Sequence, residues 1–242
     1  MDNETAKEKY LAVKELFRRM RNEMGVVIES YYIWRTLTFS RSIPEVGQEK
    51  AVRIAKLMSS YKDFFVSTEQ SHLQTFIIGL MKFFDNDPRT LSIKNLIKEI
   101  QANEKIFTPE VIRAVHPDLE AIGAVTDDYI PIDQDTVEQI ENTCQTYATL
   151  IENLKDIRDK QIAHTEIKTM KVTFVPNEIE ALIKAIQEMF NKLSGKFDLS
   201  STILDHLQDD AIRSTKFMLE NLERGDVAFR EEIKKKWGSE QN

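Results

Sequence analysis

The stretch IENLKDIRDKQIAHTE, residues 151–166, contains an arginine and a histidine whose types and spacing could do chemistry. His164 follows Arg158 by six positions. An imidazole titrates near neutral pH and therefore suits proton transfer. At a helix C-terminus, the negative end of the backbone dipole would also favour its protonated form. The residue types of Arg158 and His164 would therefore allow proton transfer beside a fixed positive charge.

The helix expected from about Asp133 through this stretch places Arg158 on an apolar face. Apolar side chains recur there at alternating spacings of three and four, which is typical of a seam that packs against another helix: Val137, Ile140, Cys144, Tyr147, Ile151 and Leu154. Arg158 is the next residue in this rhythm, and a buried guanidinium without a partner is costly. At about 100° per residue, His164 lies roughly 120° around the helix from Arg158. The two can approach if the helix bends or ends near Ala163, or if two chains form one composite cleft, which the seam supports.

The spacing alone does not distinguish catalysis from structure. Chance gives about 0.6 pairs in this composition with an arginine four to six residues before a histidine. On pattern alone, Arg158 also fits a structural ion pair or a dimer contact, and His164 fits an ordinary helix-end cap. His72, His116 and His206 form no helical metal motif, and we expect neither a metal nor another cofactor.

Helical periodicity runs through most of the chain. We expect helices over residues 4–24, about 27–37, 44–66, 67–84, 92 onward, 109–115, about 133 onward and 177–195, with a break after Gly25 between the first two. Two C-terminal helices that meet around Gly225 complete the chain. Thr108 and Asn177 are predicted N-caps, and Gly195 is a predicted stop. Residues 123–133 read as a loop, and 171–175 as an extended segment.

The composition suits an all-α globular protein. Of 242 residues, 41% are hydrophobic and 30% charged, with few glycines and prolines to make tight turns. No linker or repeat is evident, so we expect a single domain over 1–242. The one cysteine, Cys144, excludes an intrachain disulfide and favours a reducing compartment. No apolar stretch is long enough to cross a bilayer, and we expect a cytoplasmic protein with no membrane partner.

Two segments carry a resemblance to a known family. The stretch IRDKQIAH resembles the signature of the HEPN superfamily, in particular its abortive-infection AbiU-like branch, where Arg-Asp-Lys precedes Ala-His. A second segment, FFVSTEQSHLQTFIIGLMKFFDNDPRTLSI, resembles an earlier helix of that branch, which ends in a Phe-Asp turn followed by Leu-Ser. The two segments occur in the expected order, about seventy residues apart.

The resemblance implies a HEPN-like helical bundle with additional helices. Its core would cover about 5–195, and a C-terminal helical extension about 196–242. Many members are dimeric, metal-independent ribonucleases whose arginine and histidine form the catalytic pair, here Arg158 and His164. Asp159 matches the polar residue that follows the arginine, and Asp85 matches the Phe-Asp turn. From the residue types, Asp85 fits a helix cap or an arginine pair better than a chemical role.

RNA cleavage by such a pair would begin with attack of the 2′-hydroxyl on the neighbouring phosphorus. His164 would act as general base or acid, and Arg158 would stabilise charge on the phosphorane. The products would be a 2′,3′-cyclic phosphate and a 5′-hydroxyl. A small basic island would contact the RNA, since residues 155–171 hold five basic against three acidic side chains, a net of +2. Its lysines are Lys155, Lys160, Lys168 and Lys171.

This island is small on a chain whose net charge is -7, and a solvated helix end explains it as well as an RNA contact does. The resemblance also implies a homodimer, an RNA substrate and an antitoxin or other defence partner. Relatives controlled by nucleotide attachment carry a tyrosine where this chain has Glu166, which puts that control in doubt. The alternative is a non-catalytic dimeric RNA-binding or protein-adaptor module.

Overall fold

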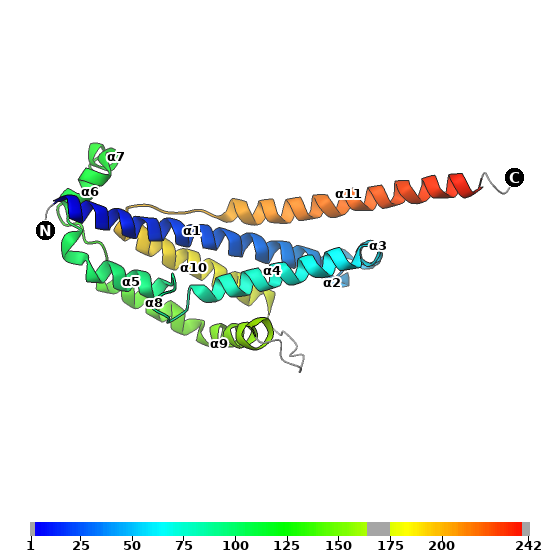
Figure 1. Cartoon of the computed structure of the whole chain (residues 1–242), viewed down its shortest axis with the longest axis horizontal. Helices are drawn as coiled ribbons and strands as arrows, with labels where there is room; N and C mark the ends of the chain where they lie inside the picture. The colour runs from blue at the N-terminus through cyan, green and yellow to red at the C-terminus, as the bar shows by residue number, and fades with distance from the viewer. Residues whose placement is uncertain (1–2, 164–174, 239–242) are drawn as a thin grey trace. The chain divides into compact units, whose positions relative to one another are not determined.

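The computed structural model describes residues 3–163 and 175–238, and these residues form helices and connecting segments with no β-strand. The helices are coloured along the chain in Figure 1. Contacts divide the chain into two compact units. Unit 1 holds residues 1–27 and 77–203, and unit 2 holds residues 28–76 and 204–242. These bounds differ from the predicted boundary near residue 195, but they do not test whether the chain is one folding domain, which stays a prediction.

The all-α prediction is confirmed for the described residues. The predicted break after Gly25 is wrong, because α1 runs without interruption over Asn3–Phe39. Its buried side chains continue at helical spacing through the glycine, from Met20 and Met24 to Val27, Ile28 and Tyr31. A single glycine costs a helix about 1 kcal/mol, so a continuous apolar face outweighs it.

The predicted helix over 44–66 is divided in the structure into α2 (Ile43–Val46), α3 (Gln48–Ser60) and the beginning of α4 (Lys62–Lys82). Gly47 separates the first two with a φ of 80°, a conformation that glycine adopts without strain. Helix α4 therefore begins five residues before the predicted start at Ser67. In unit 2, α1, α3, α4 and α11 contribute to one buried cluster, Leu37, Ile54, Met58, Phe65 and Leu219.

Several predicted helix ends are confirmed. The Ser92 hydroxyl accepts the backbone N–H of Asn95 at the start of α5 (Ile93–Ala102), and the isoleucine and leucine side chains of this helix are buried. A 3₁₀ turn, η1 (Glu104–Ile106), leads to α6 (Pro109–Val115) and α7 (Pro117–Ala121). Residues 123–133 are the predicted loop, after which Asp133 caps α8 (Gln134–Thr146) by accepting the Thr136 N–H at 2.8 Å.

Other predicted helix ends are wrong. Helix α10 (Pro176–Phe197) has Val175, not Asn177, at its N-cap, with Pro176 in the first helical position. It continues past Gly195 and ends where the Phe197 carbonyl accepts hydrogen bonds from the Tyr10 and Tyr129 hydroxyls. The two C-terminal helices are one, α11 (Asp205–Gly238), which passes through Gly225.

The long helix predicted from Asp133 is interrupted at Tyr147. Helix α9 (Ala148–Ile157) follows α8 and then becomes a π-helical segment, η2 (Arg158–Ala163). The Thr143 and Thr146 hydroxyls donate to carbonyls four residues earlier, a bonding pattern that bends helices. The seam of side chains thereby extends over two helices instead of one.

An aromatic cluster joins α1, the η1–α6 connection and α10 in unit 1. Tyr10 and Phe17 stack on Phe197 with ring centroids 4.6 and 5.1 Å apart, and Phe107 and Phe190 meet the same cluster edge to face. The first part of α1 is thereby fixed against α10. Offset-stacked and edge-to-face pairs such as these add stability beyond their buried area.

Helices α1 and α4 approach closely at Gly79. A Cβ added to this glycine would lie 2.5 Å from Cγ2 of Val27, so only a residue without a side chain fits. The close approach fixes the C-terminal end of α4, from which the chain turns toward Asp85. Glycine at this position therefore helps to position that turn.

We predict that Gly79→Ala lowers the free energy of unfolding by about 1 kcal/mol in urea denaturation. Overpacking against Val27 costs about 1–3 kcal/mol, which exceeds the roughly 1 kcal/mol that alanine gains over glycine in a helix. Gly225→Ala is the matched control, because no atom lies within 4 Å of its added Cβ. The control substitution should stabilise the protein. A Gly79→Ala variant that is stabilised to the same extent would contradict the close packing.

Candidate active site

The turn between α4 and α5 is closed by backbone hydrogen bonds. The Ile93 N–H donates to the Phe83 carbonyl at 3.1 Å, which joins the end of one helix to the start of the next. The Asn95 side-chain amide donates to the carbonyls of Asp87 and Thr90 at 2.7 and 2.9 Å. The turn is therefore fixed from inside by one asparagine.

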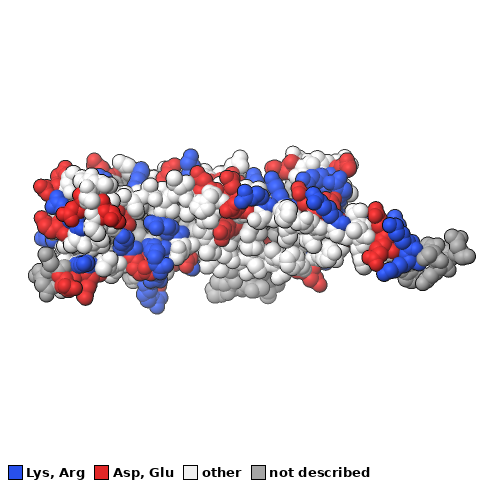
Figure 2. Space-filling model, turned by 90° about the horizontal axis from the view of Figure 1, so that it is seen from above, with Lys and Arg blue, Asp and Glu red and all other residues white. Residues whose placement is uncertain are grey.

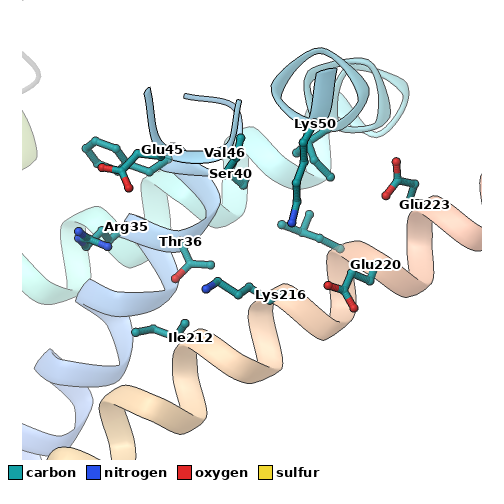
Figure 3. Close-up of a pocket in the computed structure, with 13 residues that line it drawn as sticks. Arg35, Thr36, Ser40, Glu45, Val46, Lys50, Ile212, Lys216, Glu220 and Glu223 are labelled. Carbon is teal, nitrogen blue, oxygen red and sulfur yellow. The ribbon is translucent and has the colours of Figure 1, made fainter. Parts of the chain in front are cut away.

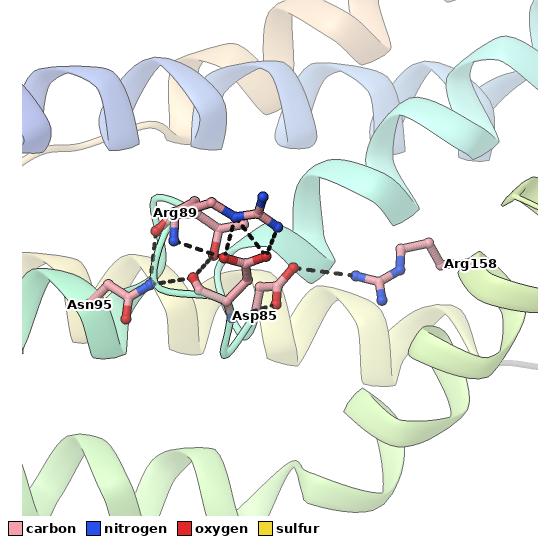
Figure 4. A network of polar contacts seen from close by, with 6 residues as sticks. Asp85, Arg89, Asn95 and Arg158 are labelled. Atoms are coloured by element: carbon pink, nitrogen blue, oxygen red, sulfur yellow. Dashed lines mark hydrogen bonds and ion pairs between the residues drawn. The ribbon is translucent and has the colours of Figure 1, made fainter.

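Two aspartate carboxylates also stabilise this turn by accepting hydrogen bonds from its backbone. The Asp85 carboxylate accepts the backbone N–H of Asp87 at 3.0 Å, and the Asp87 carboxylate accepts that of Arg89 at 2.9 Å. The Arg89 guanidinium also donates hydrogen bonds to the Asp87 carboxylate. Together with the bond from the Arg89 backbone N–H, they lower the pKa of the Asp87 carboxyl to about 2. Figure 4 shows this network around Asp85, Arg89 and Asn95. One Asp85 oxygen is thus occupied within the turn, which leaves the other to face outward.

Arg158 meets this turn from the start of η2. Its Nη1 lies 3.9 Å from Oδ2 of Asp85, an ion pair that is too long for a hydrogen bond, and its Nε donates to Oδ1 of Asp159 at 2.7 Å. The Arg158 side chain is 23% exposed. The carboxylates thereby compensate a half-buried guanidinium. This juxtaposition brings together the two sequence segments that carried the resemblance (Figure 4).

The remaining predicted site residues divide into two groups. Lys155 is exposed on α9, and Lys160 forms an ion pair with Asp156 at 2.7 Å. His164, Lys168 and Lys171 lie outside the described residues, as does most of the predicted extended segment over 171–175. The predicted approach of Arg158 and His164 therefore stays a prediction.

An apolar groove of about 640 Å³ runs between α5 and the α8–α9 pair in unit 1. Most of the predicted seam lines it, with Val137, Ile140, Cys144 and Ile151 facing Ile97 of α5. Phe83 and Phe84 belong to the same lining, so the groove borders the turn that holds Asp85. Burial raises the pKa of the Cys144 thiol, which disfavours a reactive thiolate there.

A sequence model of the AbiU2 family of HEPN proteins matches residues 10–218. The chain belongs to this family. No curated protein and no solved structure gives a significant match. The AbiU2 match covers both units in part, and it includes the turn at Asp85 as well as the segment that begins at Arg158. The family resemblance inferred from these two segments is thereby confirmed.

Asp87 and Asn95 were not predicted as part of this AbiU2 site, although the sequence carried a signal for them. Asp, Asn and Pro in DNDPRT are residues that form turns through their own side chains. What the sequence could not give is the tertiary partner of the turn, Arg158. Over residues 3–163 and 175–238, no three His, Cys, Asp or Glu side chains are grouped to hold a metal, and no helix has the length and apolarity to span a bilayer.

Unit 2 has a pocket of its own, of about 190 Å³, between α1, α2, α3 and α11. Arg35, Lys50 and Lys216 line it together with Glu45, Glu220 and Glu223, and apolar side chains complete its wall (Figure 3). The Nε of Arg53 donates a hydrogen bond to Oε1 of Glu223, at a distance of 2.7 Å. Equal numbers of acidic and basic side chains give this pocket no clear preference for a charged ligand.

We predict that Asn95→Ala lowers the free energy of unfolding by about 1–2 kcal/mol, because two carbonyls of the turn lose their donor. Asn86→Ala is the matched control within the same turn. Among the described residues, the Asn86 side chain accepts a single exposed hydrogen bond, from Lys94, so its loss should cost less than about 0.5 kcal/mol. Equal effects of the two substitutions in urea denaturation would argue against Asn95 as the residue that fixes the turn.

Proposed function

We propose that this AbiU2-family chain is a metal-independent endoribonuclease of a phage-defence or toxin system. The RNA 2′-hydroxyl would attack the adjacent phosphorus as its proton passes to a base. The bond from phosphorus to the 5′ oxygen would break, and that oxygen would take up a proton. His164 would transfer protons, and Arg158 would stabilise the phosphorane with its planar fork of donors. The reaction leaves a 2′,3′-cyclic phosphate and a 5′-hydroxyl.

The observation that carries this proposal is the meeting of Arg158 with the Asp85 turn. A guanidinium at 23% exposure remains accessible to a phosphate at one edge while carboxylates hold it in place. Such preorganisation lets a charged donor act without reorganising as charge develops. Asp85 and Asp159 would therefore position Arg158 and take no part in proton transfer. Lys155, Lys160, Lys168 and Lys171 would supply further RNA contacts.

A non-catalytic dimeric RNA-binding or adaptor module is the alternative, and one observation favours it. Arg158 has a hydrogen bond to Asp159 and an ion pair with Asp85, which is also what a purely structural arginine requires. Under this alternative, Arg158→Ala would mainly destabilise the protein. Under the leading proposal, it would mainly slow cleavage.

We also propose that the protein is a homodimer that associates through the groove between α5 and α8–α9. Its α5 rim carries Lys94 and Lys98, and its α8–α9 rim carries Glu141 and Glu152. A two-fold axis would place the lysines of one copy against the glutamates of the other, since such an interface is self-complementary. The groove borders the Asp85 turn, so two active sites would lie near one interface. We place this dimer in the cytoplasm and expect an antitoxin or another defence partner to control it.

For cleavage, we predict that purified protein degrades total RNA in EDTA and that His164→Ala abolishes the reaction. Arg158→Lys keeps the charge but loses the two-pronged donor geometry, and it should slow cleavage on the order of 10²-fold. End analysis of the products should find cyclic phosphates. Circular dichroism and light scattering would show whether the variants keep the helical content and oligomeric size of the parent.

Each remaining outcome has a distinct meaning. Cleavage by both parent and His164→Ala would point to a contaminant or another site and would contradict the assigned pair. Absence of cleavage by any protein, across substrates and concentrations, would favour the non-catalytic alternative.

For association, we predict that Ile151→Glu converts the dimer to a monomer in light scattering, because a carboxylate would enter the apolar groove. Thr149→Glu is the matched control. It lies two residues away on α9, is exposed and does not line the groove. If Ile151→Glu remains dimeric, the groove is not the interface.

A further inference from the structure

The first part of α1 separates its charges into two arcs. At about 100° per residue, Lys7, Lys14, Arg18 and Arg21 fall within roughly 60° of one another around the helix. Glu4, Glu8 and Glu15 fall in the neighbouring arc. We name the four basic side chains the α1 basic stripe. It extends over about 21 Å of helix, at 1.5 Å per residue. Such segregation indicates a surface with a charge preference of its own on an acidic protein.

The stripe lies beside the buried face of α1, within unit 1. Lys7 and Arg18 are exposed, whereas Lys14 and Arg21 are half-buried, so their alkyl stems cover apolar surface and their charged ends remain near solvent. The Arg21 guanidinium stands 5.9 Å above the ring of Phe190. Figure 2 shows lysine and arginine side chains interspersed with aspartate and glutamate over the face in view.

Among the four side chains of the stripe, Arg18 is paired with a carboxylate of a described residue and the two lysines are not. Lys7 and Lys14 form no ion pair with a described residue, and the Lys14 ammonium lies 3.3 Å from Nε2 of His116, an imidazole whose pKa is lowered by burial. Arg18 is paired with Glu15 in an exposed contact, and such contacts contribute little to stability. Glu15 accepts hydrogen bonds from both Nε and Nη2 of Arg18 and so offsets that charge, which leaves the charges of Lys7 and Lys14 without a carboxylate partner among the described residues.

Arg21 adds to the stripe a charge that no carboxylate among the described residues pairs with. Its Nε is buried and has no hydrogen-bond partner among the described residues. A buried donor without a partner is costly, so the protein itself leaves this guanidinium incompletely compensated. A phosphate at the solvent-facing edge of the guanidinium would compensate the positive charge, and the buried Nε lies outside its reach.

We propose that the α1 basic stripe binds the phosphate backbone of single-stranded RNA. This inference rests on the proposed function, which supplies RNA as the substrate. Four cations along 21 Å match a flexible chain of regularly spaced negative charges better than a single small anion, which only one or two of them could reach. The exposed Leu11 adjoins the stripe and offers apolar surface on which a base could rest. The stripe would hold the part of the RNA that lies outside the cleaved bond.

The test measures RNA binding apart from cleavage. Full-length protein carrying His164→Ala would be titrated against a fluorescein-labelled 16-nucleotide single-stranded RNA at several salt concentrations, with anisotropy as the readout. Adding Lys7→Gln and Arg18→Gln should weaken binding on the order of tenfold at low salt. It should also reduce the slope of log K against log salt by about 1.4, because each lost phosphate contact contributes about 0.7.

Lys9→Gln with Arg19→Gln is the matched control. It removes the same charge from the same helix, but both side chains lie outside the basic arc. If binding weakens equally in the two double variants, it depends on net charge alone, and the proposal that the stripe binds RNA is wrong. Unchanged binding in the Lys7 and Arg18 variant also overturns it, and an acidic protein then becomes the better partner for this surface. Absence of any RNA binding overturns it as well.

Failure of the proposed function has a different signature. In one outcome, the parent chain does not cleave RNA while the Lys7 and Arg18 double variant binds RNA more weakly than the control variant. In that case the ribonuclease proposal is wrong and the RNA-binding role of the stripe is supported. If the parent cleaves RNA and the stripe variant binds like the control variant, the ribonuclease stands and the stripe fails. Circular dichroism of both double variants confirms that folding is unchanged, which is expected because Lys7 and Arg18 are exposed.

Discussion

An arginine at the end of an apolar helix face can stay folded inward only if carboxylates reach it, because a half-buried guanidinium is costly without partners. Arg158 obtains one carboxylate from its neighbour Asp159 and another from Asp85 on a turn far away in the sequence. The second partner requires tertiary structure. Much of unit 1 can be understood as the framework that brings the Asp85 turn and the start of η2 together.

That framework is built from close contacts at defined positions. Gly79 lets α4 approach α1, the Ile93 N–H joins the end of α4 to α5, and Asn95 closes the turn between them. On the other side, the interruption at Tyr147 separates α9 from α8 before η2 begins. A π-helical segment is uncommon and often marks a functional position. Arg158 stands at its first residue, where the backbone departs from the regular helix.

Periodicity and caps predicted elements more reliably than they predicted contacts. Ser92 and Asp133 work as local caps because a side-chain oxygen needs only a backbone N–H two or three residues away. Gly25, Gly195 and Gly225 were misread as ends because the outcome there depends on whether buried faces continue beyond them, which is a tertiary property. The pairing of Arg158 with Asp85 was foreseeable as a type of interaction, since Asp85 was expected to cap a helix or pair with an arginine. The sequence did not identify which arginine.

Two carboxylates contact Arg158, and the difference between these contacts determines where a phosphate could approach the guanidinium. Asp159 holds Nε in a short hydrogen bond, whereas Asp85 stands 3.9 Å from Nη1 and makes only an electrostatic contact. An incoming phosphate would therefore displace little hydrogen bonding if it approached on the Nη side, and the short bond would keep the guanidinium plane oriented. Two carboxylates so near would repel a phosphate in isolation. Favourable binding therefore needs positive charge elsewhere, and a basic surface on α1 could provide this attraction without weakening the restraint on Arg158.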